Sequence, residues 1–464
     1  MKRTSLVLLA LTIVASLLLA CAPPAAPAAP AAGGEAAPTE AGKVTLNVWA
    51  SPDNGDALNE IARTFMEKNP NIEVVVTVIS WEQLYAKMLS DVAAKTGAYD
   101  VATWDVMTAG ALANGLEDLA QFKKDHPDLV DPNWDENDFD PTVWHVSGIW
   151  AGKNIGIPFY NNTMLFYYRK DLFNDPNLQA AFKEKYGRDL EVPKTWDETV
   201  EVAEFFTKSA NPDSPTDYGI ALMFPRTHTT FYMYLLWFAG YRRSEEGLAK
   251  FGELDLDYGD YFTADHKPAF ASEEGLKAMQ DIAKLLPFSP DPLGSDYGET
   301  LEAFSKGTVA MVPQWTNPWA TWKTVEALQP FEEKVGAAVM PGGHSVGGSW
   351  ALGINVNSKH KAEAFKFIQY ATNKDNDKMK FIKFGAAPAR ISTLEDPEVL
   401  AADPRVPALK ETYPEQAYRP RIPEEPKLED ITISTFTGML LGEQPMTVET
   451  LQTLADQWNR ILGQ

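Results

Sequence analysis

The chain has 464 residues, 41 of them basic and 64 acidic, which gives a formal net charge of −23 near neutral pH. That charge disfavours nucleic acid as a partner and also disfavours a polyanionic ligand. With only one cysteine the chain cannot form an internal disulfide, so a hydrophobic core must hold the fold together.

The first residues have the pattern of a secretory signal. Lys2 and Arg3 precede an apolar run over residues 6–20, which is shorter than the roughly 20 residues needed to span a bilayer. The sequence LLAC that ends at Cys21 is similar to the lipobox of bacterial lipoproteins, whose cysteine becomes the lipid-modified first residue. We therefore predict a signal peptide over residues 1–20 and lipidation at Cys21. An ordinary signal with an incidental cysteine is the alternative.

Residues 21–42 are rich in alanine and proline and carry no large apolar side chain. Such a segment cannot bury surface in a core, so we predict a tether. The globular part would then be extracytoplasmic and anchored to the cell membrane through Cys21.

From residue 43 the apolar pattern alternates between the periods of strands and helices. Strands are predicted over 44–49, 72–78 and 99–103, with helices over 56–69 and 82–95 between them. Strands that alternate with helices through short connections indicate parallel pairing and an α/β sheet.

A segment rich in Pro, Asp and Trp follows over residues 126–150. Within it Asp131, Asn133, Asp135 and Asn137 alternate like a calcium loop. However, residue 136 lacks the glycine and residue 142 the glutamate that such a loop needs, so a solvated loop is the simpler interpretation. A structural calcium near residues 131–137 is left open.

The second half is predicted to be mainly helical. Strand character over 155–168 is followed by helices over 195–207, 272–286 and 299–305, a buried strand over 308–312, and helices over 361–372 and 447–462. The apolar run 224–241 is predicted to be a core helix rather than a membrane span. Residues 396–421 contain several prolines and are predicted to be irregular.

The glycine-rich stretch 335–357 contains two motifs that suggest catalysis. GHSVG resembles the nucleophile elbow of α/β-hydrolases, with Ser345 as the nucleophile. The only later histidine is His360, no acidic residue lies between the two, and the following sequence WALGINVN indicates a strand instead of the required helix. A phosphate loop would need a lysine where Gly348 stands. With no zinc-binding spacing either, we predict no catalytic residue, no metal and no cofactor.

Several motifs together are similar to those of one known family. They are YDVATWD at 99–105, GIPFYNNTMLFYYRKDLF at 156–173, PKTWDE at 193–198, KGTVAMVPQWTNPW at 306–319, and the stretch 335–357 with NSKHKAEAFKFI after it. The chain resembles the family 1 extracellular solute-binding proteins of ABC importers, the maltose-binding-protein type.

The resemblance implies a two-lobe, periplasmic-binding-protein-like α/β fold (type II), in which each lobe is a sheet flanked by helices and hinge bending closes the lobes around a solute. It places lobe 1 at residues 43–158 plus 349–402 and lobe 2 at 159–348 plus 403–464. The chain would cross between the lobes near Pro158, Gly348 and Asp403.

Carried over position by position, the resemblance implies a set of ligand contacts in the interlobe cleft. Asn162 stands where the maltose-binding relative has an acidic residue, and the loop 347–350 is expected to line the cleft. The expected ligand-binding residues are Trp49, Asp53, Trp104, Asp105, Tyr160, Asn162, Trp315, Asn317, Trp319, Gly347, Gly348, Ser349 and Trp350.

The function expected from this resemblance is capture of an extracellular carbohydrate, in the first instance an oligosaccharide, and its delivery to an ABC permease by a monomer that catalyses no reaction. One alternative is an extracellular lipoprotein hydrolase that uses Ser345. Another is the same fold binding a polyol phosphate or a polyamine. Whether Arg226, Arg419 or Arg421 reaches the cleft, where an arginine would suit an acidic sugar, is left open, as are the length and identity of the sugar.

Overall fold

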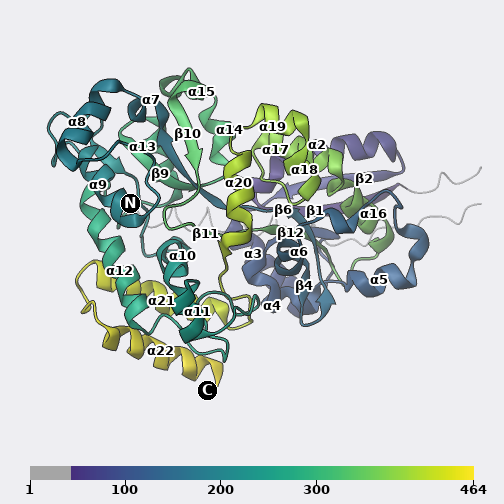
Figure 1. Cartoon of the computed structure of the whole chain (residues 1–464). Coiled ribbons are helices and arrows are strands. Elements are labelled where there is room, and N and C mark those ends of the chain that lie inside the picture. The colour runs from purple at the N-terminus through teal and green to yellow at the C-terminus, as the bar shows by residue number, and fades with distance from the viewer. Residues whose placement is uncertain (1–42) are drawn as a thin grey trace, which may run out of the picture. The chain divides into compact units, whose positions relative to one another are not determined.

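The structure is a computed structural model that describes residues 43–464, so the predicted signal peptide and tether, with Cys21, lie outside the described residues. Two sheets with helices packed around them organise this part of the chain (Figure 1). The mixed α/β fold expected from the sequence is confirmed.

The first sheet has five strands in the order β2-β1-β3-β12-β6. Strands β1 (Val44–Ala50), β2 (Ile72–Val78) and β3 (Val101–Asp105) are parallel, because helices α2 (Pro52–Lys68) and α3 (Trp81–Ala94) return the chain to the same end each time. The buried face of α2 includes Leu58, Ile61 and Phe65, at the helical spacing that the sequence indicates. The predicted parallel unit is therefore confirmed.

Two further strands enter this sheet from distant parts of the chain. Strand β12 (Trp350–Ile354) pairs antiparallel with both β3 and β6 (Ile157–Tyr160). In this register Trp350 lies opposite Asp105 on one side and Tyr160 on the other. The sequence WALGINVN is thus a strand, as predicted, and the helix that a nucleophile elbow requires does not follow Ser345.

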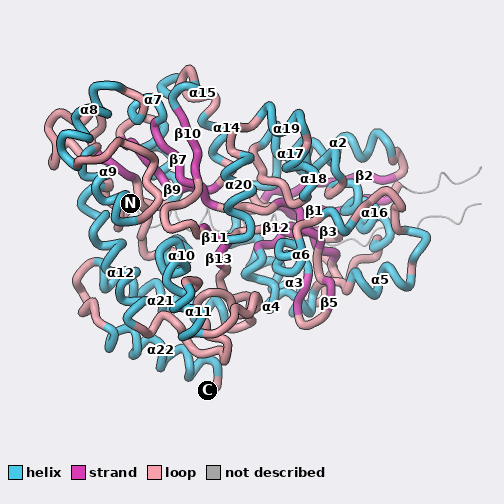
Figure 2. The backbone as a smooth tube through the Cα atoms, viewed as in Figure 1, coloured by secondary structure: helices cyan, strands magenta, loops and turns pink. Residues whose placement is uncertain are grey.

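The second sheet has four strands in the order β10-β7-β9-β8. Strand β7 (Met164–Arg169) pairs antiparallel with β10 (Val335–Ala338) and β9 (Val309–Trp315), and β8 (Tyr218–Ile220) pairs parallel with β9. The remaining short strands are β4 (Ile149–Trp150), β5 (Lys153–Asn154), β11 (Ser345–Val346) and β13 (Gln416–Ala417). Figure 2 shows helices surrounding both sheets.

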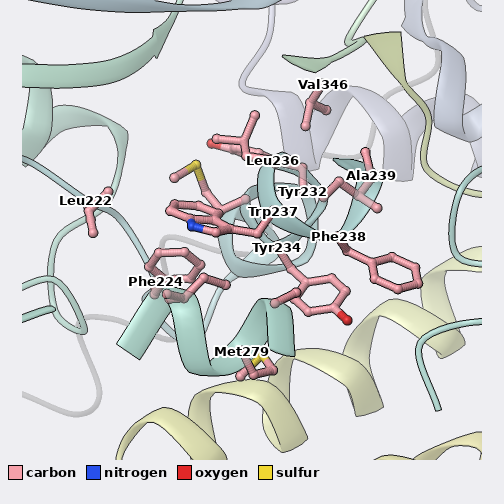
Figure 3. Close-up of a cluster of buried hydrophobic side chains, with 14 of the residues drawn as sticks. Leu222, Phe224, Tyr232, Tyr234, Leu236, Trp237, Phe238, Ala239, Met279 and Val346 are labelled. Carbon is pink, nitrogen blue, oxygen red and sulfur yellow. The ribbon is translucent and has the colours of Figure 1, made fainter. Parts of the chain in front are cut away.

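The apolar run 224–241 forms helix α10 (His228–Arg242), which is buried along almost its whole length. Its side chains pack with Leu222, Met279 and Val346 in the cluster drawn in Figure 3. Trp237 stacks on Trp196 with ring centroids 3.9 Å apart. The predicted core helix is confirmed, and within residues 43–464 no helix combines the length and apolar character of a membrane span.

The other α-helices surround the sheets. They are α4 (Ala109–Leu112), α5 (Leu119–Asp125), α6 (Pro141–Gly148), α7 (Lys170–Phe173), α8 (Pro176–Tyr186), α9 (Trp196–Phe205), α11 (Glu245–Phe251), α12 (Glu273–Leu285), α13 (Tyr297–Ser305), α14 (Pro318–Trp322), α15 (Phe331–Lys334), α16 (Lys361–Ala371), α17 (Lys374–Phe384), α18 (Ile391–Glu395), α19 (Pro397–Ala402), α20 (Val406–Thr412), α21 (Glu425–Leu440) and α22 (Val448–Leu462).

The expectation of irregular structure over residues 396–421 is wrong in part, because α19 and α20 lie within this segment. Proline occupies the first turn of each helix, where its missing amide hydrogen costs nothing. The calcium-like segment is a loop with a single 3-10 turn, in which Asp131 and Asp135 accept hydrogen bonds from the backbone amides of Asn133 and Asn137.

Three large clusters of buried side chains and one small cluster, of Val106, Val146 and Tyr418, form the core of residues 43–464. One covers the first sheet and a second covers α10, α12, α21 and α22. The third joins β9 and α14 to α17–α20 through Trp319, Trp322, Phe381 and Leu409. Segments from both halves of the chain therefore share cores, and the lobe boundaries given above stay a prediction.

Lys380 is a fully buried cation that connects α17 to strand β6. Its Nζ donates a hydrogen bond to the carbonyl of Phe159 and lies 3.4 Å from Asp377 Oδ1. Burial lowers the pKa of Lys380 to about 8, against the opposing attraction of Asp377. Phe159 precedes the end of β6, so this contact fixes the strand from which the chain crosses between the sheets.

The pKa of Lys380 predicts how stability depends on pH. From about pH 8 up to the ordinary lysine value of 10.5 the unfolded chain holds a proton that the folded chain has lost. The free energy of unfolding of the wild type should therefore rise with pH across this window relative to Lys380→Met, by about 3 kcal/mol in total. Urea unfolding at several pH values, with the exposed Lys383→Met as control, measures this difference. Parallel pH profiles for the wild type and Lys380→Met would contradict it.

Candidate functional site

A cavity of about 610 Å³ lies between elements of the two sheets. Its volume falls within the range of roughly 300–1,000 Å³ that is usual for small-molecule sites. Fifteen residues line it: Asp53, Trp81, Asp105, Asn162, Thr227, His228, Thr229, Tyr232, Asp296, Tyr297, Trp315, Asn317, Gly348, Trp350 and Arg419.

One wall is built at the carboxyl ends of the parallel strands. Asp53 begins α2 after β1, Trp81 begins α3 after β2, and Asp105 ends β3. Trp350 joins them because β12 runs antiparallel and places its first residue beside the last residue of β3. Ligands of open α/β sheets bind at this edge, where the strands end and the helices begin.

The opposite wall comes from the second sheet and its helices. Trp315 ends β9 and Asn317 follows it just before α14. The first turn of α10 contributes His228 and, one turn further on, Tyr232, whose ring contacts Trp315 edge to face at 5.2 Å. Residues 296–297 at the start of α13 complete this wall.

Segments that connect the sheets close the cavity. Asn162 lies between β6 and β7, Gly348 between β11 and β12, and Arg419 follows β13. A Cβ atom on Gly348 would come within 2.7 Å of the Trp315 ring, so glycine is needed for this loop to pack against that indole.

Two polar contacts join the walls. Asn317 Nδ2 donates to Asp53 Oδ1 at 3.1 Å, and Arg419 Nη2 donates to Asp105 Oδ1 at 3.1 Å. Asp53 is exposed to the cavity, yet the surrounding protein and the nearby charge of Asp105 raise the pKa of its carboxyl group.

The charges around the cavity are close to balance. Three carboxylates line it, Asp53, Asp105 and Asp296, against the single guanidinium of Arg419. Helices α2, α3, α10 and α13 also begin at the cavity, and the partial positive charge of each helix N-terminus offsets part of the excess negative charge of the carboxylates. Such a site suits a neutral solute rich in hydroxyl groups, which carboxylates and amides can bind as acceptors and donors.

Seven of the expected ligand contacts line the cavity and six do not. The seven are Asp53, Asp105, Asn162, Trp315, Asn317, Gly348 and Trp350. The remaining six are Trp49, Trp104, Tyr160, Trp319, Gly347 and Ser349, and for each the structure gives a different environment.

Neighbouring residues on a strand point to opposite faces, which explains the position of Trp104. Asp105 faces the cavity, so Trp104 before it is buried on the other face, with 2% of its surface exposed. Trp49 is half-buried on β1, and its ring packs against Tyr99 with centroids 4.8 Å apart. Tyr160 is buried at the end of β6.

Trp319 belongs to the core. Its ring packs against Phe331 at 4.6 Å and under the Arg405 guanidinium at 4.9 Å, and only 2% of its surface is exposed. The hydroxyl of Ser349 donates to Asn161 Oδ1 at 2.7 Å, while Gly347 packs against the Tyr418 ring. These residues support the walls from behind.

The sequence-based prediction did not include eight residues that line the cavity, or left them open. Arg419 is the arginine that reaches it, whereas Arg226 pairs with Glu443 and Arg421 with Asp257. The others are Trp81, Thr227, His228, Thr229, Tyr232, Asp296 and Tyr297. Trp81 could have been predicted to line the site, because it starts a helix directly after a strand of the parallel unit.

Ser345 does not line the cavity. Its side chain is fully buried, its hydroxyl donates to the carbonyl of Met164 at 2.6 Å, and its oxygen accepts from the amide of Met164 at 3.1 Å. These bonds connect β11 to β7. A serine held in this way has a structural role, and no histidine is among its hydrogen-bond partners within residues 43–464.

Comparisons with known proteins identify the class of the chain. The sequence profile of the family described as bacterial extracellular solute-binding protein matches residues 49–378. A probable amino-acid ABC transporter periplasmic-binding protein of Sinorhizobium fredii is 26% identical over 76% of this chain and 74% of its own length. The mannitol-binding protein of Pseudomonas aeruginosa is 25% identical over 75% of this chain and 73% of its own length.

Solved structures show the same fold. The solute-binding protein of Agrobacterium radiobacter in complex with ribitol has a TM-score of 0.72 and 25% identity, and covers 90% of this chain and 98% of its own. Maltose-bound MalE3 of T. maritima also has a TM-score of 0.72, with 23% identity over 89% of this chain and 98% of its own.

Substitution of two tryptophans that lie four residues apart should have different effects, one on solute binding and the other on stability. Trp315→Ala removes an aromatic wall of the cavity and should weaken solute binding more than tenfold with little change in stability. Trp319→Ala empties a core site and should lower the free energy of unfolding by about 3–5 kcal/mol. Calorimetry with the best-binding sugar or polyol, together with urea unfolding, separates the two effects. The assignment would be contradicted if Trp319→Ala lost solute binding while still folded and Trp315→Ala kept it.

Proposed function

The chain belongs to the bacterial extracellular solute-binding protein family, and we propose that it captures a sugar or polyol in the cavity between its two sheets and delivers it to the permease of an ABC importer. The observation that carries the proposal is the cavity itself, which combines aromatic faces with hydrogen-bonding groups from both walls and has nearly balanced charge.

The lining of the cavity matches the chemistry of a carbohydrate. The indole faces of Trp81, Trp315 and Trp350 offer apolar surface to the C–H faces of a sugar ring or a polyol chain. Asp53 and Asp105 accept hydrogen bonds from hydroxyl groups, while Asn162 and Asn317 can both accept and donate. Relatives of the chain include proteins that bind mannitol, ribitol and maltose.

We also propose that the protein performs no chemistry on its solute and acts as a monomer. Its contribution would be differential binding, in which the solute favours the arrangement with both walls in contact. The bonds from Asn317 to Asp53 and from Arg419 to Asp105 are the contacts that hinge opening would break.

A thermal-shift panel tests the class of solute. Maltose, D-mannitol, ribitol and D-tagatose represent the proposed class, and spermidine, glycerol 3-phosphate and leucine represent cationic, anionic and zwitterionic solutes. A solute present at 100 times its dissociation constant stabilises the folded state by about 2.7 kcal/mol, so a member of the first group should raise the melting temperature. A shift with only the second group would contradict the proposal.

Membrane anchoring through Cys21 is the second part of the proposal. In cells, the wild type should fractionate with the membrane, and Cys21→Ser should move the protein to the soluble extracytoplasmic fraction, because no thiol remains for the lipid. Thr39→Ser, in the same tether, is the matched control. Equal partitioning of the wild type and Cys21→Ser would show that this cysteine does not anchor the protein.

A further inference from the structure

A chain of polar side chains runs from the cavity into the protein beside α10. His228 Nδ1 lies 3.0 Å from Glu429 Oε2, and His228 Nε2 lies 3.2 Å from Arg419 Nη1. Arg419 Nη2 continues the chain to Asp105 Oδ1 at 3.1 Å. Three of these residues, His228, Arg419 and Asp105, also line the cavity.

The protonation state of the imidazole follows from its partners. A guanidinium is always a donor, so Nε2 of His228 must accept the hydrogen bond from Arg419. A neutral imidazole then carries its single hydrogen on Nδ1, where it donates to the carboxylate of Glu429. The observed arrangement therefore requires an uncharged His228.

Two members of this chain, Arg419 and His228, contact the wall that the first sheet forms. Asp105 ends strand β3 of the first sheet, and Arg419 reaches it from the segment after β13. His228, at the start of α10, stacks on Trp81 at the start of α3, with centroids 5.1 Å apart and planes 22° apart. A change in the charge of His228 therefore affects two contacts between the walls. One is its own stacking on Trp81, and the other is the hydrogen bond from Arg419 to Asp105.

Arg419 reaches the cavity although almost all of its surface is buried. Its residue surface is 3% exposed, its Nη atoms contact His228, Met107 and Asp105, and its Nε has no hydrogen-bond partner within residues 43–464. A buried donor without a partner is costly, so this guanidinium depends on the partners of its Nη atoms. Because Arg419 also lines the cavity, a solute there lies beside the same guanidinium that joins the walls.

A second carboxyl group, that of Glu425, lies beside the acidic end of the chain. Burial, together with the neighbouring Glu429, raises the pKa of Glu425 well above its usual range. Burial acts in the same direction on Glu429, but His228, Glu425 and Arg419 together outweigh it and lower the pKa of Glu429. Burial and these two glutamates raise the pKa of Tyr85, on α3, to about 12. The other titratable groups that line the cavity are Asp53, Asp296 and the Tyr232 and Tyr297 hydroxyls.

We propose that solute capture is coupled to proton release at His228, so that the protein holds its solute at neutral pH and releases it in acid. A solvent proton that binds the lone pair of Nε2 removes the acceptor of Arg419 and places two positive charges side by side. Arg419 then withdraws from His228, and its contacts with Asp105 and the solute weaken together. This inference rests on the proposed function and adds a regulatory property to the same site.

The expected size of the effect follows from ordinary histidine chemistry. A protein that binds its solute only with the neutral imidazole should lose affinity several-fold between pH 7.5 and 5.5, the range in which histidine ordinarily changes its charge. Titration calorimetry of the purified protein with the best binder among maltose, D-mannitol and ribitol measures this ratio. Repeating the titration at pH 6 in buffers of different ionisation enthalpy should show proton release on binding.

Three variants separate His228 from other titrating groups. His228→Gln should make affinity independent of pH over this range, whatever its absolute affinity. Glu429→Gln keeps the histidine but removes its carboxylate partner, so the loss of affinity between pH 7.5 and 5.5 should be smaller than in the wild type. His266→Gln removes a histidine that stacks on Tyr258 outside the cavity and should keep the wild-type ratio.

Each outcome decides the proposal. Equal wild-type affinity at pH 7.5 and 5.5, or an unchanged pH dependence in His228→Gln, would overturn it and leave solute capture itself intact. Unchanged behaviour of Glu429→Gln would likewise count against the role of Glu429 in the chain. Binding of none of the three solutes would count against the proposed function, and against this inference with it.

Discussion

Strand β12 lies between β3 and β6, and its antiparallel pairing with both strands carries the chain from one sheet to the other. This pairing of β12 has three effects on the candidate site. It places Trp350 beside Asp105 at the edge where the parallel strands end, it positions Gly348 against Trp315, and it directs the chain before β12 into contact with β7 through Ser345. Without this pairing neither wall of the cavity would face the other.

The energetics of the cavity come from compensation between groups of opposite sign. Arg419 is almost fully buried and would be costly without Asp105, whereas Asp53 and Asp296 have no basic partner among residues 43–464 and lie at helix N-termini. The aromatic side chains then supply apolar surface that carries no charge. This combination explains why the site favours neutral hydroxyl-rich solutes, and it also explains why one added positive charge at His228 would disturb the balance.

Much of the fold could be predicted from the sequence because it depends on local patterns. The parallel unit follows from alternating periods of two and 3.6, the core helix from an uninterrupted apolar run, and the family from ordered motifs. The residues of the site are harder to predict, because a residue at the end of a strand can face either the cavity or the core. Trp104 and Asp105 are adjacent, yet one is in the core and the other in the cavity. Trp315 and Trp319 belong to the same motif, and only the directions of β9 and α14 decide which of them faces the cavity.

Other residues of the site could not be assigned to the cavity from one sequence. His228, Asp296 and Arg419 are far apart along the chain, and only the packing of α10, α13 and the segment after β13 brings them to one cavity. A crystal structure of the protein with the sugar or polyol that binds best tests this site most directly. We predict a solute in contact with Asp53, Trp315 and Trp350 at once. A solute bound elsewhere, such as the surface pocket between α2 and α16, would contradict it.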